Sequence, residues 1–231
     1  MSTRAKLRTW LPLALGLATF PTLNAHAAFV MSLDDLGDSA APTIIYDGSG
    51  NDLSGPNGII TYSGTIGAFD VNVTTGISNP ITGPATLNLN SINVTGSSGG
   101  SLVVKITDTD FTGSFAELGA GYGGSTEGAI EIEFLQDVYN TEFGGTAFAS
   151  GAHTSSMGDL HFSEELVGSV MPGEPFSLSI VAVINHEAGG EFTSFEAGIA
   201  PVPLPASIWL FGSALAAIGA RRRLFRWVNR L

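Results

Sequence analysis

The sequence predicts an all-β protein, an antiparallel β-sandwich or jelly roll of roughly 8–10 strands. Apolar and polar residues alternate in several short runs, which is typical of strands with one buried face. Clusters of glycine separate these runs, and the chain has 30 glycines in 231 residues. Between residues 28 and 200, no helical spacing of apolar residues continues for more than a turn or two. We therefore expect a single folded domain made of strands and tight turns.

The expected strands can be placed along the chain from these runs. Ile92 and Val94 are out of phase with Leu87 and Leu89, which predicts a β-bulge near Ser91. The segments 117–124 and 146–157 show no clear alternation, and we expect them to be longer loops. The alternating runs lie at residues 71–74, 87–89, 92–94, 130–134 and 176–184.

The N-terminal segment, residues 1–27, has the three parts of a secretory signal peptide. Basic residues come first, an apolar stretch follows, and Ala25 and Ala27 provide the small residues of a cleavage site. Signal peptidase is therefore expected to cut before Ala28. An uncleaved membrane anchor is the alternative, although the apolar stretch is about half the ~20 residues that span a bilayer.

The C-terminal segment, residues 201–231, predicts a transmembrane helix. Seventeen residues from Leu204 to Ala220 contain no charged side chain, and a basic cluster follows them. Arginines remain on the cytoplasmic side of a membrane, so the preceding domain at residues 28–200 is expected outside the cytoplasm. The basic cluster consists of Arg221, Arg222 and Arg223.

The same tail resembles the PEP-CTERM sorting signal of Gram-negative bacteria. The resemblance rests on a proline-containing motif, the apolar helix after it and the arginine cluster; the motif is Val202, Pro203, Leu204, Pro205 and Ala206. Leu204 stands where the family has a glutamate. The resemblance implies processing by an exosortase, in species that make exopolysaccharide. The protein would be anchored transiently in the inner membrane and then delivered to the cell surface or the extracellular space. An ordinary membrane anchor is the alternative.

Charge is strongly segregated along the chain. Every acidic residue lies between Asp34 and Glu196, whereas Lys105 is the only lysine or arginine from residue 28 to residue 200. This part of the chain has a formal charge of −20, from 21 acidic residues and one lysine. Binding to nucleic acid requires cationic side chains that contact phosphates. Nucleic-acid partners are therefore excluded, and cations such as calcium are favoured.

One acidic loop resembles half of a calcium-binding loop. Short oxygen-bearing side chains alternate with glycines there, as calcium coordination requires. The loop has no closing glutamate, since Gly58 occupies that position. Residues of these types also favour turns without a metal. Asp108 and Asp110 form a second acidic candidate, and the candidate ligands in the loop are Asp47, Ser49, Asn51 and Asp52.

Catalytic motifs are weak. Residues 96–100 fit the Gly-x-Ser-x-Gly pattern of hydrolases, but a strand-like run follows where that motif needs a helix, which favours a hairpin turn. His161 precedes Glu164 and Glu165, a spacing that is also common in solvated loops and strand ends. The chain has no cysteine, which excludes disulfides and a cysteine nucleophile. We expect no enzymatic activity.

Function is therefore expected to lie in interactions outside the cell. The first interpretation is a structural or interaction role at the cell surface or in the matrix, associated with exopolysaccharide or biofilm. The alternative is a carbohydrate- or calcium-binding module, and a secreted hydrolase is the third. All three tryptophans lie in the terminal segments, so a sugar site in the domain would lack tryptophan stacking. The absence of arginine there favours neutral sugars over uronic acids.

Overall fold

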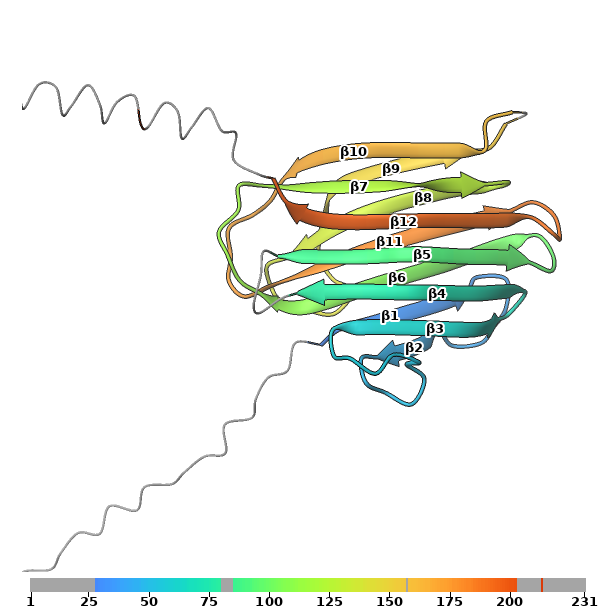
Figure 1. Cartoon of the computed structure of the whole chain (residues 1–231), viewed down its shortest axis with the longest axis horizontal. Coiled ribbons are helices and arrows are strands. Elements are labelled where there is room, and N and C mark those ends of the chain that lie inside the picture. Colours follow the sequence, from blue (N-terminus) through green and yellow to red (C-terminus); the bar gives the residue numbers. More distant parts are fainter. Residues whose placement is uncertain (1–27, 80–84, 157, 203–212, 214–231) are drawn as a thin grey trace, which may run out of the picture.

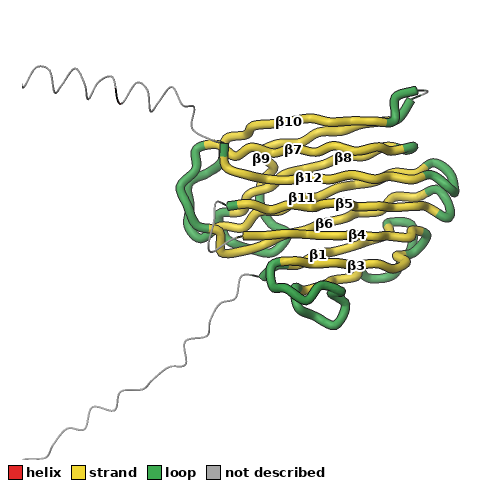
Figure 2. The backbone as a smooth tube through the Cα atoms, viewed as in Figure 1, coloured by secondary structure: helices red, strands yellow, loops and turns green. Residues whose placement is uncertain are grey.

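A computed structural model describes residues 28–79, 85–156, 158–202 and 213 of the chain. The predicted signal peptide and the predicted transmembrane helix lie outside these residues. Two six-stranded antiparallel sheets face each other and form a sandwich, which confirms the predicted fold class (Figure 1). Loops join the strands at both ends of the sandwich (Figure 2). In the part of the chain that the structure describes, no helix is long and apolar enough to cross a membrane.

The first sheet has the strand order β2-β1-β6-β11-β8-β9. Its central strands β6 and β11 are long, and most of their residues are buried, because both of their faces are largely covered. The strands span Val30–Asp35 (β1), Thr43–Tyr46 (β2), Gly100–Phe111 (β6), Ala129–Asp137 (β8), Thr146–Thr154 (β9) and Phe176–His186 (β11).

The second sheet has the strand order β10-β7-β12-β5-β4-β3. Its strands alternate between buried and exposed residues more regularly, because one face packs on the first sheet and the other faces outward. The strands span Ile59–Ile66 (β3), Phe69–Asn79 (β4), Thr86–Gly96 (β5), Glu117–Thr126 (β7), His161–Ser169 (β10) and Phe192–Pro201 (β12).

Twelve strands are present in the described residues, more than the 8–10 expected. The segments 117–124 and 146–157 were expected to be loops, and this expectation was wrong. They contain β7 and β9, which pair along their length with β10, β12 and β8. Small residues hide the alternation in both strands, since glycine and alanine give a weak hydrophobic signal. Both segments form strands because their backbones pair with neighbouring strands, although their side chains give no clear strand pattern.

The predicted bulge at Ser91 is present. Two residues of β5, Asn90 and Ser91, lie opposite the single residue Glu196 of β12, where the register shifts. Ser91 adopts a φ of 52°, the positive value that a bulge residue takes. The bulge lets Leu89 and Ile92 both point into the core although they are out of phase.

A single hydrophobic core fills the space between the sheets. Side chains from both sheets alternate into it, and the largest fully buried ones include Phe69, Phe111, Phe134 and Phe176. Burying one such side chain contributes about 1.5–3 kcal/mol relative to leaving it in water. These side chains form one continuous core between the two sheets.

The two sheets differ in what covers their outer faces. At one end of the first sheet, the segment after β8 folds over the outside: Ser177 Oγ donates a hydrogen bond to Thr141 O, and Asn140 Nδ2 donates one to Asp110 Oδ1. Ser177, which points outward and contacts this segment, is fully buried. The outer face of the second sheet instead carries several depressions.

Candidate binding groove

Two glycines of β7, Gly121 and Gly123, form the floor of a groove on the outer face of the second sheet. Leu118, Ala120 and Tyr122 of the same strand point into the core, so the alternating Gly119, Gly121 and Gly123 face outward. β10 lies on one side of β7 and β12 on the other. Gly198 of β12 pairs with Gly121 and extends the bare floor onto the next strand.

At Gly121 the fold leaves room for a side chain. None of the floor glycines has a positive φ. A Cβ built on Gly121 would come no closer than 3.6 Å to Glu164 O, an ordinary contact. One on Gly123 would lie a tighter 3.3 Å from Phe162 O, and one on Gly198 would lie 2.5 Å from Asn88 Oδ1, so the Asn88 side chain would have to shift. Glycine weakens a strand interior, and in such a place it often marks close approach by a ligand or another backbone. The bare floor is therefore better explained by what approaches it than by the fold.

Polar side chains form the two walls. One cross-strand row runs from Glu165 on β10 through Gly121 and Gly198 to Asn88 on β5. Neighbouring strands lie about 4.8 Å apart, so the two walls of this row are separated by about 14 Å of backbone. The groove, hereafter the glycine groove, has a volume of about 340 Å³; its lining includes Asn88, Asn90, Gly121, Gly123, Ser163, Glu164, Glu165, Glu196 and Gly198.

From the core side of the sheet, Tyr122 holds β10, the strand along one edge of the glycine groove. Its hydroxyl donates a hydrogen bond of 2.7 Å to Glu164 Oε2, and its ring packs on Phe134 and Phe162. Burial, together with the Glu164 carboxylate, raises the pKa of Tyr122 to about 12. The neutral hydroxyl therefore remains a donor throughout the physiological range, and it holds Glu164 in place.

The depression continues along the same face. A second part is lined by Ser91, Ser163, Ser194 and Glu196, and a third lies over β3, β4 and β5 beside Asp70, Asn72 and Asn93. Ser194 Oγ donates a hydrogen bond of 2.9 Å to Asn93 Oδ1 between the two parts. This face thus offers amides, hydroxyls and carboxylates. Lys105, the only lysine or arginine among the described residues, lies in the first sheet.

The predicted calcium loop is present as a turn after β2, and its carboxylates accept backbone hydrogen bonds. Asp52 Oδ1 accepts from the amides of Ser54 and Thr61, and its Oδ2 accepts from Gly48 N. Asp47 Oδ2 accepts from Gly58 N at 2.7 Å. In the described ranges, no three His, Cys, Asp or Glu side chains are grouped closely enough to hold a metal.

The other acidic candidate is split between two environments. Asp110 is half-buried and hydrogen bonds to Asn140, whereas Asp108 is 1% exposed on the inner face of β6. Burial raises the pKa of Asp108 to about 6; the Ser78 hydroxyl and the Thr109 amide lower it, and Asp110 and Asp47 raise it further. Asp108 is therefore an acid held between the sheets.

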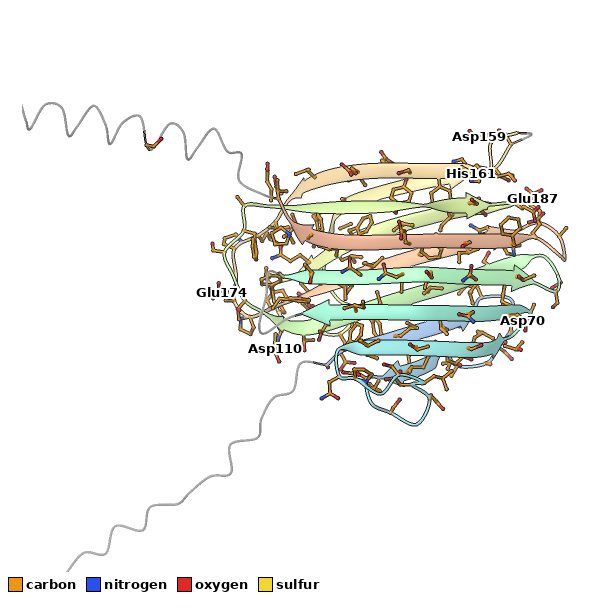
Figure 3. The ribbon with its side chains drawn as sticks, in the orientation of Figure 1. Asp70, Asp110, Asp159, His161, Glu174 and Glu187 are labelled. Atoms are coloured by element: carbon orange, nitrogen blue, oxygen red, sulfur yellow. The ribbon has the colours of Figure 1, made fainter. Side chains whose placement is uncertain are left out.

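The hydrolase candidates do not assemble a triad in the described residues. Residues 96–100 form the turn between β5 and β6, as expected for a hairpin. His161 Nδ1 lies 2.6 Å from Ser125 Oγ, but no carboxylate bonds to His161 in the described part of the chain. His161 lies at the end of the sandwich opposite Asp110 (Figure 3). A base without an orienting acid lacks one element of the usual nucleophile arrangement.

Sequence reasoning missed the glycine groove. A signal was available, because glycine alternates with Leu118, Ala120 and Tyr122 at the spacing of a strand. Only the pairing of β7 with β12 and β10 places its glycines beside Gly198, Asn88 and the acidic wall.

Comparison with protein families identifies the tail. Residues 201–223 match the model of the PEP-CTERM protein-sorting motif. The chain carries a PEP-CTERM sorting signal. The matched span includes the predicted motif and the arginine cluster, and the signal implies export with exosortase-dependent processing at the membrane. It begins where β12 ends, since Pro201 still pairs with Leu118 of β7. A comparison with curated protein sequences finds no match.

Comparison with solved structures finds several β-sandwich modules at low similarity. TmCBM61 in complex with β-1,4-galactotriose has a TM-score of 0.34 and 8% identity, covering 58% of this chain and 88% of that one. A family 29 carbohydrate-binding module variant complexed with mannohexaose has a TM-score of 0.31 and 11% identity, with 76% and 92% covered. The xylan-binding domain CBM22-1 from Paenibacillus barcinonensis Xyn10C has a TM-score of 0.32 and 12% identity, covering 64% of this chain and 88% of that one. At these values the resemblance carries no information about ligand or site.

Proposed function

We propose that this PEP-CTERM protein acts outside the cytoplasm, at the cell surface or in the extracellular matrix, and that its glycine groove holds a neutral polysaccharide. Export and exosortase-dependent processing follow from the sorting signal. Signal peptidase would first cut before Ala28. The single observation that carries the binding role is the glycine floor of β7 and β12, where no glycine has a positive φ and Gly121 has room for a side chain.

The chemistry of the walls selects the class of ligand. Amide side chains such as Asn88 and Asn90 both donate and accept hydrogen bonds, and so do the hydroxyl groups of a sugar. Glu165 and Glu196 add acceptors on opposite sides of the floor. Without a lysine or arginine nearby, an anionic polymer would meet only carboxylates of its own sign. A neutral polyhydroxyl chain therefore fits better than a polyuronate.

The bare floor takes the place of an aromatic platform. Sugar sites commonly bury a ring face on tryptophan or tyrosine. Here Tyr122 points into the core, so contact with a sugar would come from the exposed backbone of Gly121 and Gly198. We expect many weak hydrogen bonds along an extended chain, and hence binding to polymers in preference to short sugars.

The test uses the full-length chain in a detergent without a sugar headgroup. Titration calorimetry would compare a soluble neutral β-glucan, a neutral mannan and the polyuronate alginate. We expect binding to at least one neutral polymer and none to alginate. Gly121→Val should weaken that binding at least tenfold, because the side chain would stand on the floor, while its Cβ has room in the fold.

A matched control separates binding from folding. Gly55 has open space around a built Cβ and lies in the loop before β3, so Gly55→Val adds the same side chain away from the groove. The proposal is wrong if no neutral polymer binds, or if Gly121→Val binds as well as Gly55→Val. It is also wrong if sedimentation shows that the chain self-associates through this face and that Gly121→Val abolishes the association.

A further inference from the structure

Two oxygen atoms between the sheets are buried without a hydrogen-bond partner. One is Asp47 Oδ1, at the end of β2, and the other is the Ser78 hydroxyl, near the end of β4. Ser78 is 4% exposed and belongs to the second sheet, whereas Asp47 adjoins the first. Leaving a buried polar atom unpaired costs about 1–3 kcal/mol, so each such atom requires an explanation.

Backbone register brings these atoms to the same layer of the sandwich. Met31 lies between Ile45 and Ile106, all three of which point into the core. Phe29 lies two residues before Met31, just ahead of β1, and its carbonyl oxygen accepts a hydrogen bond from Asp47 N. On the other side of Phe29, the register of β1 with β6 places Asp108. Asp47 and Asp108 therefore flank Phe29 on the inner face of the first sheet.

The second sheet places Ser78 opposite them. A Cβ built on Gly76 would contact Ile106 and Phe29, so Gly76 faces that layer. Ser78 lies two residues further along β4 on the same face and therefore faces the next layer, which contains Asp108. Consistent with this placement, the Ser78 hydroxyl lowers the pKa of the Asp108 carboxyl. Asp110, two residues beyond Asp108, marks this end of the sandwich in Figure 3.

One glycine links Asp47 to Ser78 directly. Gly58 N donates to Asp47 Oδ2 at 2.7 Å, and Gly58 O accepts from Ser78 N at 3.0 Å. Asp108 Oδ1 in turn accepts from Thr109 N at 2.8 Å. One oxygen of each carboxylate is thus held by a backbone amide. Asp47 Oδ1 has no partner, and the Ser78 hydroxyl is close enough to the Asp108 carboxyl to lower its pKa but lies outside hydrogen-bonding geometry.

Among the residues that the structure describes, no cationic side chain compensates these two carboxylates. Lys105 is the only lysine or arginine in the described residues, and it is three residues from Asp108 on the opposite face of β6. Placing buried carboxylates together without a counter-charge is strongly unfavourable. A bound cation would supply the charge and would also coordinate the unpartnered oxygens.

We propose that Asp47, Ser78 and Asp108 form a calcium site that ties the two sheets together. The available ligands are carboxylate and hydroxyl oxygens, which calcium prefers, and backbone carbonyls and water complete its six to eight ligands. Zinc favours nitrogen and sulfur ligands, and magnesium demands a stricter octahedral geometry. With only two carboxylates, the site belongs to the weaker extracellular class, with a Kd of about 10⁻⁴–10⁻³ M.

The site differs from the loop that the sequence suggests. Ser49, Asn51 and Asp52 are not part of it, and Asp52 is already occupied by three backbone amides. The inference is independent of the glycine groove, which lies on the outer face of the second sheet. A negative result for calcium binding therefore says nothing against polysaccharide binding, and the reverse also holds.

Thermal unfolding of the full-length chain tests the inference, with no glycan present. The midpoint would be measured in a chelator and in 10 mM Ca²⁺, Mg²⁺ or sodium chloride of equal ionic strength. Binding at about ten times the Kd or more should raise the midpoint by roughly 3–6 °C in calcium alone. Calorimetric titration with Ca²⁺ should give a stoichiometry of one.

Three variants distinguish a site from a general charge effect. Asp108→Asn and Ser78→Ala should lose most of the calcium response, and Asp108→Asn should unfold at a higher temperature than the wild type in chelator. Asp159→Asn removes the same charge from an exposed carboxylate at the other end of the sandwich and should respond as the wild type does. No calcium shift, an equal magnesium shift, or an unchanged response in Asp108→Asn would overturn the proposal.

Discussion

The hydroxyl of Tyr122 lies 2.7 Å from Glu164 Oε2 and donates a hydrogen bond to it across the pair β7 and β10. The tyrosine ring is in the core, whereas the glutamate belongs to the lining of the glycine groove. Because Glu164 pairs with Tyr122, its side chain lies on the inner side of β10, whereas Glu165, opposite Gly121, lies on the groove side. The contact therefore ties the edge strand β10 to the core.

Tyr122→Phe should destabilise the domain by about 1 kcal/mol, because one hydrogen bond is lost while the ring packing is kept. Urea unfolding measures this difference. Absorbance titration should show the variant lacking the tyrosine that ionises near the raised pKa of about 12. Because the folded state holds the proton more tightly than the unfolded chain, this tyrosine also makes stability fall as the pH rises above about 10. Glu164→Gln retains an acceptor and should lose less stability than Tyr122→Phe.

Acid should destabilise the domain through His186. This side chain is 4% exposed, its Nε2 lies 2.9 Å from Thr193 Oγ1, and its Nδ1 is buried without a partner. Burial lowers the pKa of His186, although Glu191 and Glu127 oppose the shift. The unfolded chain therefore binds a proton that the folded chain resists. Stability should fall as the pH drops below about 6.5, the ordinary value, and should be insensitive to His186 above it.

The measurement compares urea midpoints at pH 7.5 and pH 5.5. His186→Gln should lose less stability between the two than the wild type, whereas His161→Gln, at an exposed position, should lose as much as the wild type. Equal losses in all three proteins would contradict the assignment to His186.

Processing of the tail should depend on the two prolines of the motif. Proline lacks an amide donor and fixes its φ, so Pro203 and Pro205 favour an extended segment that a transpeptidase can reach. Epitope tags placed before β12 and after Leu231 should separate in a host with a functional exosortase. Changing both prolines to alanine should keep both tags on one membrane-bound polypeptide. If the wild-type tags also remain together in that host, the tail is an ordinary anchor.

The mature protein is expected to begin at Ala28. In the structure Ala28 N donates a hydrogen bond to Thr109 Oγ1, so the described part of the chain contacts the sandwich from its first residue. Intact-mass measurement of the exported protein should give the mass of a chain that starts there. Replacing Ala27 with a bulky residue such as tryptophan should block cleavage and leave residues 1–27 attached.

Much of the architecture was predictable because it depends on local patterns. Alternation at 130–134 and 176–184 predicted strands that the structure contains as β8 and β11, neighbours in the first sheet. The phase change between Leu89 and Ile92 predicted a bulge, since a strand can keep both residues inside only by adding one between them. The sorting signal is a linear motif, so it needs no fold to be recognised.

The tertiary structure alone decided which residues meet. About 30 residues of sequence separate Asp47 from Ser78, and about as many separate Ser78 from Asp108, so no local pattern links them. The register across β1 and the packing of β4 onto β6 bring the three residues to one layer. The glycine groove likewise requires β7, β12 and β5 side by side. Strand order and sheet packing depend on contacts between segments that are distant in the sequence. The whole core contributes the free energy of these contacts, so no single run of residues predicts it.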